Sequence, residues 1–189
     1  MKIETREYKW NGTLAKRNET KYIVLHHRAG NGDVESIHKL HLGRGFSGIG
    51  YHFYVRKDGS VQKGRPIDAV GAHAVGANQI SVGVCFEGDF EKEKDMSIKQ
   101  MQSGRMLIAY LKNLYPKAVV KGHREVQSTA CPGRFFPIEK LKEEPRDMSI
   151  EEAVEIIQAK TGIEDETIEF LLCYKYGEEL VTKIAEALR

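Results

Sequence analysis

The chain has 189 residues, of which 41% are hydrophobic, and its formal net charge is +2. This size and composition suit one full hydrophobic core with a small additional unit, and they exclude an intrinsically disordered tail. No apolar stretch has the length of a membrane span, and the charged start MKIETRE lacks the apolar run of a signal peptide. We therefore expect a protein made in the cytoplasm and not inserted into a membrane.

Strands and helices are predicted to be mixed along the first three quarters of the chain. In chain order these are a strand at 21–26, a helix at 33–42, strands at 50–55 and 60–63 joined by an Asp58-Gly59 turn, a strand at 81–86, a helix capped by Ser97 that runs to Leu114, and a strand at 118–121. Because the order lacks strict βαβ alternation, we predict an α/β fold with a mixed central β-sheet flanked by helices.

A boundary is predicted in the polar segment 142–147, which contains Pro145. Beyond it, Ser149 and Glu152 match a capping box, and Gly162 and Gly177 divide the remainder into about three short helices. We therefore predict a body at residues 1–143 and a small all-α C-terminal domain at residues 148–189. A unit of about forty residues is marginal on its own core, so we expect it to bind the cell wall or to form a homodimer.

The two parts differ in charge. Residues 147–189 contain eleven acidic and four basic residues, whereas residues 1–146 contain 25 basic and 16 acidic ones. A basic body favours an anionic partner such as nucleic acid, a membrane surface or an anionic wall polymer, but a solvated surface without a partner explains the excess equally well.

Residues typical of a metal site occur in two segments, Leu25-His26-His27 and the loop GHREVQSTACPG at 122–133. Two imidazoles and a thiolate leave a tetrahedral zinc ion with one open position for water, which is the layout of a catalytic site. The three cysteines, Cys85, Cys131 and Cys173, cannot all pair, so we expect no disulfide framework and a reduced Cys131 that is free to bind metal.

Other roles remain open for the same residue types. Taken alone, His26 beside His27 on a strand favours a core histidine, and the later His-Cys pair reverses that preference. Cys131 could be a small buried hydrophobe, and we assign that role to Cys85. His38 and His41 lie three residues apart on one predicted helix face, but without a third ligand we expect them to pack rather than to bind metal.

Several further motifs occur in a characteristic order. They are Val24-Leu25-His26, Gly50-Tyr51-His52-Phe53, Gly71-Ala72-His73-Ala74, the stretch 78–84, Gly122-His123-Arg124 and Thr129-Ala130-Cys131-Pro132-Gly133. With them, the segment from about Lys21 to Leu141 resembles the zinc-dependent N-acetylmuramoyl-L-alanine amidases of the type-2 amidase and peptidoglycan-recognition-protein family, which includes phage lysozyme-amidases.

The resemblance implies a ligand set and a reaction. His26, His123 and Cys131 would be the zinc ligands, and the enzyme would hydrolyse the amide bond between N-acetylmuramic acid and L-alanine in peptidoglycan. Zinc lowers the pKa of bound water to about 7 and polarises the carbonyl group.

By the same resemblance, Tyr51 is a catalytic residue beside the water, and Thr129 occupies a second catalytic position that holds a lysine in some members. The hydroxyl of Thr129 cannot offset negative charge, so that task is left to zinc, to Tyr51 or to a cation such as Lys121 or Arg124. Tyr51 could instead be a half-buried sheet aromatic.

Two residues of the glycine-rich loop, His73 and Asn78, resemble the family's substrate groove, and we predict that they bind substrate. Loop residues of these types also serve turn geometry.

The sequence thus predicts a phage or prophage endolysin that remains in the cytoplasm until the host membrane is permeabilised and then acts on the cell wall. Its partners would be peptidoglycan and anionic wall polymers. The alternatives are a cytoplasmic amidase that recycles muropeptides and a peptidoglycan-binding module without activity. The presence of Cys131 favours an enzyme, because recognition proteins of that kind usually lack the cysteine ligand. A nucleic-acid binder is disfavoured, since no aromatic-basic interleaving or DNA-reading motif occurs.

Overall fold

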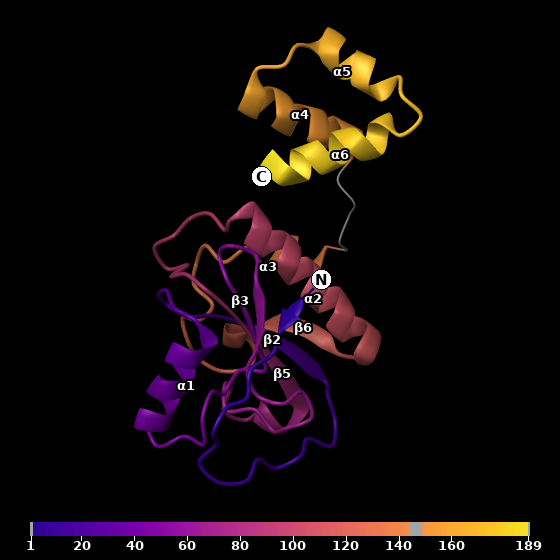
Figure 1. Ribbon diagram of the computed structural model, residues 1–189. Coiled ribbons are helices and arrows are strands. Elements are labelled where there is room, and N and C mark those ends of the chain that lie inside the picture. The colour runs from indigo at the N-terminus through magenta and orange to yellow at the C-terminus, as the bar shows by residue number, and fades with distance from the viewer. Residues whose placement is uncertain (1, 144–148, 189) are drawn as a thin grey trace. The chain divides into compact units, whose positions relative to one another are not determined.

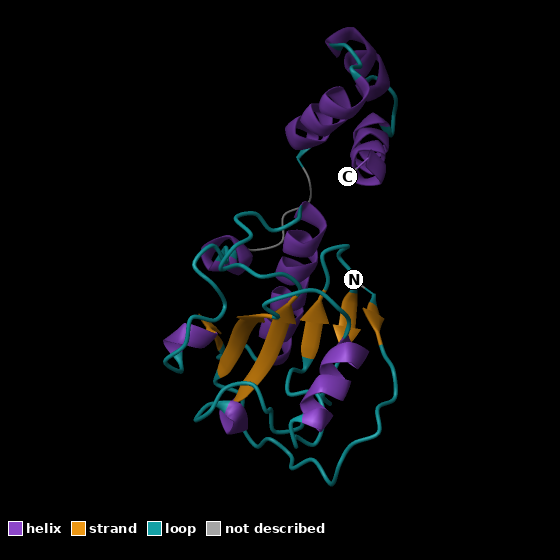
Figure 2. Ribbon diagram, turned by 90° about the vertical axis from the view of Figure 1, so that its left-hand side faces the viewer, coloured by secondary structure: helices purple, strands orange, loops and turns teal. Residues whose placement is uncertain are grey.

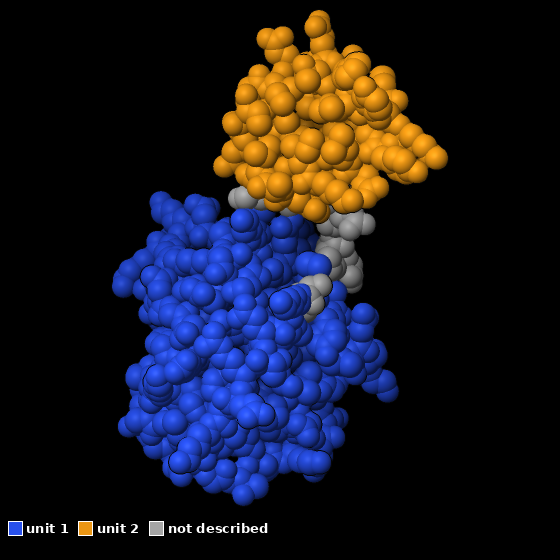
Figure 3. Space-filling view, viewed as in Figure 1, with its two compact units in different colours: residues 1–144 blue, residues 145–189 orange. Residues whose placement is uncertain are grey.

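A computed structural model of the chain describes residues 2–143 and 149–188. The chain divides into two compact units, residues 1–144 and residues 145–189 (Figure 3). Most of the predicted boundary segment, including Pro145, lies outside the described residues. None of the helices that are described is long and apolar enough to cross a membrane.

The first unit is built on a six-stranded mixed sheet (Figure 2). Its strands are β1 (Ile3–Glu4), β2 (Tyr22–His27), β3 (Phe53–Val55), β4 (Val61–Lys63), β5 (Ser81–Phe86) and β6 (Val119–Gly122), in the spatial order β1-β4-β3-β5-β2-β6. The β3–β4 pair is antiparallel and all the other pairs are parallel. This arrangement confirms the predicted mixed sheet.

Helices cover both faces of this sheet. Helix α1 (Val34–Gly43) lies against one face and helix α2 (Ile98–Leu114) against the other (Figures 1 and 2). Asp33 caps α1 by accepting a hydrogen bond from the Ser36 amide, and Ser97 caps α2 in the same way through the Gln100 amide. The short helix α3 (Ile138–Lys142), which the sequence did not predict, follows Pro137.

The alternation of side chains along β2 assigns its two histidines to different faces. Ile23 and Leu25 are fully buried in the core cluster that includes Leu107 of α2. Because successive strand side chains point to opposite faces, His27 shares that side and His26 faces the α1 side. Cys85, the register partner of His26 on β5, lies in the other cluster, with Val34 and Ile37 of α1.

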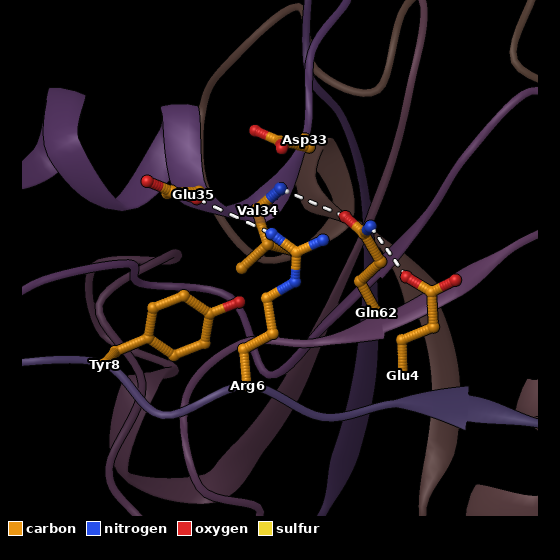
Figure 4. A pocket seen from close by; sticks show the side chains of 7 residues that line it. All are labelled: Glu4, Arg6, Tyr8, Asp33, Val34, Glu35 and Gln62. Carbon is orange, nitrogen blue, oxygen red and sulfur yellow. Dashed lines mark hydrogen bonds and ion pairs between the residues drawn. The ribbon is translucent and has the colours of Figure 1, made fainter.

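The N-terminal segment is tied to the start of α1 (Figure 4). The side-chain carbonyl of Gln62 accepts a hydrogen bond from the Val34 amide, and its amino group donates to Glu4. Arg6 forms an ion pair with Glu35 at 3.5 Å. These polar groups line a small hollow and are paired with one another, so we assign them a structural role in holding the N-terminal segment against α1.

The second unit consists of three helices, α4 (Ile150–Thr161), α5 (Asp165–Leu172) and α6 (Gly177–Leu188). The predicted capping box of Ser149 and Glu152 is formed, and Gly162 ends α4 with a positive φ of 70°. The second unit has a separate hydrophobic core, whose buried residues are Ala153, Ile157, Ile168, Val181 and Ala185.

Candidate metal centre

Residues from two distant segments of the sequence converge at one end of the sheet. His26 lies near the end of β2, His123 opens a 3-10 turn (His123–Glu125) directly after β6, and Cys131 follows in the next loop. One ligand atom from each residue lies within 4.8 Å of the others, and no other group of this kind occurs among the residues that the structure describes. His26 is fully buried, whereas His123 and Cys131 are partly exposed.

The parallel pairing of β2 with β6 brings the two histidines together. Leu25 is the register partner of Gly122, so each strand delivers its histidine one residue further along. Cys131 is brought to them by the loop: its carbonyl accepts a hydrogen bond from the Arg124 amide at 2.9 Å, and its amide donates to the Thr129 hydroxyl at 3.2 Å. The site is therefore formed by the ends of β2 and β6 and by the loop at 123–131, which is held by its own backbone hydrogen bonds.

The histidines differ in whether the ring atom Nδ1 accepts a hydrogen bond from a backbone amide. Four rings accept a backbone N–H at Nδ1: His27 from Phe90, His38 from Ile49, His41 from Gly50 and His52 from Gly83. His73 uses its Nδ1 toward His26. Within the described residues, no backbone amide contacts Nδ1 of His26 or His123, and Nδ1 of His26 lies 3.7 Å from the sulfur of Cys131. His73 aside, the Nδ1 atoms that no backbone amide occupies thus belong to the two histidines of the cluster.

Burial controls the protonation of these groups. It lowers the pKa of His26 well below its usual value, with His73 and His123 adding to the effect, and it also lowers the pKa of His123. A lowered pKa favours the neutral imidazole, which can offer a lone pair. Burial raises the pKa of the Cys131 thiol to about 11, whereas a bound metal cation would deprotonate it.

The two predicted catalytic residues border the cluster. The Tyr51 ring lies 5.0 Å from the His26 ring between centroids, and burial holds the pKa of its phenol well above the usual value, so Tyr51 is a hydrogen-bond donor at neutral pH. Thr129 uses its hydroxyl oxygen to accept the Cys131 amide, which leaves its O–H free to donate.

The predicted substrate residues are in contact with other parts of the protein. His73 is buried, and its two ring nitrogens face His26 at 3.0 Å and Ser81 at 3.4 Å. The side-chain oxygen of Asn78 accepts the amides of His73 and Ala74. These contacts assign both residues to the organisation of the loop, and substrate binding by them stays a prediction.

The other candidate residues lie outside the cluster. Lys121 places its ammonium 4.8 Å from the centre of the Tyr22 ring, and the Arg124 guanidinium donates to the Gly133 carbonyl. His38 and His41 pack and hydrogen-bond with backbone, in agreement with the role expected for them.

Sequence reasoning missed Gln127. Its side-chain oxygen lies 3.0 Å from Nε2 of His123 and also accepts the Val75 amide at 2.8 Å. The signal available in the sequence was its position four residues after His123, which in a helical turn places two side chains on the same side.

Comparison with known proteins agrees with this geometry. The profile of the N-acetylmuramoyl-L-alanine amidase family Amidase_2 matches residues 16–134, which include all three members of the cluster. The chain belongs to this family. Its predicted enzyme class is thereby confirmed: it is a hydrolase of the N-acetylmuramoyl-L-alanine amide bond.

Similar proteins include phage enzymes and animal recognition proteins. The endolysin of Klebsiella phage KP32 is 40% identical over 127 residues, which is 63% of this chain and 84% of that protein. The N-acetylmuramoyl-L-alanine amidase LysC of Clostridium intestinale URNW is 42% identical with a TM-score of 0.72, over 75% of this chain and 95% of that one. Drosophila PGRP-LB is 27% identical with a TM-score of 0.65, over 71% of this chain and 90% of that one. The helical unit at 149–188 lies beyond the matched family range.

Proposed function

We propose that this amidase is a zinc-dependent endolysin of a phage or prophage, in which His26, His123 and Cys131 hold the metal. It would cleave peptidoglycan of the bacterial wall from within, after the host membrane is permeabilised. The observation that carries the proposal is the convergence of two neutral imidazoles and one thiol within 4.8 Å.

The donor set fits zinc. A sulfur and two imidazole nitrogens are ligands that zinc prefers, and three protein ligands leave a fourth position open. Each histidine has one ring nitrogen facing a side chain outside the cluster, His73 for His26 and Gln127 for His123, so one nitrogen of each ring remains for a metal. Partial exposure of His123 and Cys131 gives solvent and substrate access on that side.

When bound, zinc would supply a water molecule acidic enough to attack at neutral pH and a Lewis acid for the amide carbonyl. The protein's own residues would then handle the developing negative charge. Tyr51, a protonated phenol beside His26, can donate to the oxyanion. Thr129 holds the Cys131 backbone and can direct its O–H toward the substrate. Lys121 and Arg124 have contacts outside the cluster, so the proposal gives this task to the metal and to Tyr51, whose hydroxyl also has the Cys85 thiol beside it.

Two observations argue for an enzyme rather than a peptidoglycan sensor. Cys131 is present and lies beside His26, and Tyr51 is in place next to the cluster. A recycling amidase with the same site would have less use for the separate unit at 149–188.

The test is to digest purified peptidoglycan and to identify the new ends. Hydrolysis by this site releases free amino groups on L-alanine without new reducing sugars, stops after chelation and resumes when zinc is added. New reducing ends would identify a glycosidase and overturn the proposal.

We further propose that the acidic C-terminal unit directs wall attachment or self-association, and that residues 1–146 fold and hydrolyse soluble muropeptides alone. The support is a separate core in each unit and the excess of acidic residues after residue 146. Loss of soluble-substrate turnover on truncation would show that the tail completes the catalytic unit.

Removal of this acidic segment should strengthen attraction of the basic body to anionic wall polymers. That attraction should fade at ionic strengths above about 0.15 M, where charges are screened within roughly 8 Å. A wall pull-down across a salt series, with the solution mass of both proteins, separates attachment from self-association.

A further inference from the structure

The Nε2 atoms of His26 and His123 both contact side chains that are connected to one loop. His26 Nε2 lies 3.0 Å from His73 Nδ1, and His123 Nε2 lies 3.0 Å from the side-chain oxygen of Gln127. His73 belongs to the loop at 71–80, and Gln127 is bound to the same loop through the Val75 amide. A single segment therefore contacts the far side of both imidazoles.

The direction of the hydrogen bonds at His26 follows from the chain of partners behind it. Ser81 has one hydroxyl proton, which it donates to the Ala77 carbonyl at 2.6 Å. Its oxygen is left to accept from His73 Nε2. His73 Nδ1 is then unprotonated and accepts from His26 Nε2–H. The remaining lone pair of His26 is on Nδ1, the atom that faces Cys131.

The direction at His123 follows from Gln127. The Val75 backbone amide can only donate, so the Gln127 atom at 2.8 Å is the oxygen. The same oxygen faces His123 Nε2, which must therefore carry the proton. His123 is left with a lone pair on Nδ1, as His26 is.

The His73 ring packs closely against two glycines. A Cβ atom at Gly83 would lie 2.6 Å from the ring, and one at Gly71 would lie 2.5 Å from it. The ring thus fits against two glycines, one on β5 and one in its own loop. Asn78 braces the same loop by accepting the His73 and Ala74 amides.

We propose that His73 and Gln127 are positioning residues that fix the Nε2–H tautomer and the orientation of His26 and His123, so that both present Nδ1 to the metal. This inference rests on the proposed metal site. A histidine that donates its outer N–H to a fixed acceptor is a better-oriented ligand, and loss of such an acceptor weakens metal affinity by about 10–100-fold.

The tautomers can be observed without metal. In the ¹⁵N-labelled apoprotein, long-range ¹H–¹⁵N correlation spectra should show His26, His73 and His123 protonated at Nε2, with assignments from single His variants. Protonation of His26 or His123 at Nδ1 would overturn the inference.

Metal affinity is the second test, with zinc and a competing chromogenic chelator on the full-length protein. Gln127→Met and His73→Leu remove the acceptor and should weaken zinc binding by about 10–100-fold. Gln127→Glu and His73→Asn keep an oxygen that can accept the histidine N–H. Their zinc affinity should therefore stay within about threefold of that of the unmodified protein. Gln79→Met, at an exposed glutamine of the same loop, is the matched control.

The outcomes separate this inference from the proposed function. If Cys131→Ser abolishes zinc binding while Gln127→Met and His73→Leu bind like the unmodified protein, the positioning role is wrong and the metal site stands. If Cys131→Ser leaves zinc affinity unchanged, the metal site itself is wrong. Unfolding of His73→Leu would leave the comparison of Gln127→Met with Gln127→Glu to decide.

Discussion

Two pairs of histidines in this protein differ in the use of Nδ1. His38 and His41, on α1, each use Nδ1 to accept a backbone amide, whereas His26 and His123 have no such partner among the described residues, and Nδ1 of His26 lies 3.7 Å from the Cys131 sulfur. The difference shows that residue type and spacing alone do not identify a ligand. His26 and His123 differ from the helix pair in two ways, because the backbone leaves their Nδ1 unused and they also lie beside a thiol.

The largest expected effect comes from removal of the thiolate. Cys131→Ser should lose bound zinc and more than about a thousandfold in turnover, because both the nucleophile and the charge stabilisation depend on the metal. The measurements are metal content and the rate of amide hydrolysis. Cys173→Ser, at an exposed cysteine of the second unit, is the control and should be unchanged. A metal-free Cys131→Ser protein with full activity would contradict the mechanism.

The second effect separates catalysis from ligation. Tyr51→Phe should retain zinc and lower turnover by roughly ten- to a thousandfold, since it deletes one donor to the oxyanion. Tyr54→Phe is a matched control from the next strand, because the buried Tyr54 hydroxyl has no hydrogen-bond partner among the described residues. If Tyr51→Phe were as fast as the unmodified enzyme at saturating substrate, Tyr51 would be a packing residue.

A smaller effect is expected at Thr129. Thr129→Ala removes the acceptor of the Cys131 amide and should slow turnover by about two- to tenfold, the range that corresponds to one net hydrogen bond. Thr129→Ser keeps the hydroxyl and should be near normal. Equal losses in both variants would indicate that the methyl group, and not the hydroxyl, matters.

His41 should influence acid stability and not metal binding. Burial lowers the pKa of His41 to about 4, below the unfolded value of 6.5. Above pH 6.5 the imidazole is neutral in both the folded and the unfolded state. Between pH 6.5 and about 4 only the unfolded chain gains the proton, so the free energy of unfolding decreases as the pH is lowered. His41→Asn, which can still accept the Gly50 amide, should reduce that slope by up to about one proton and leave zinc affinity unchanged. Chemical denaturation at several pH values measures the slope, and weaker zinc binding in this variant would contradict the division between the two pairs.

Local signals in the sequence predicted most of the fold. The apolar run at 81–86, the Asp58-Gly59 turn and the Ser97 cap each occur where the structure has β5, the β3–β4 hairpin and α2. The two-residue strand β1 escaped prediction because Ile3–Glu4 has no apolar run, and its pairing with β4 depends on the whole sheet.

The three residues of the cluster could be predicted from the sequence because they lie in recognisable motifs. The contact of Gln127 with Val75 and that of His73 with His26 were not, because a hydrogen bond between residues 52 or 47 positions apart depends on how the loop at 71–80 folds back over the sheet.

The most direct test of the metal centre is X-ray absorption at the zinc edge of the zinc-loaded, full-length protein. The account predicts one sulfur at about 2.3 Å and three nitrogen or oxygen neighbours at about 2.0–2.1 Å. A zinc environment without sulfur, or with two or more sulfurs, would contradict ligation by His26, His123 and Cys131.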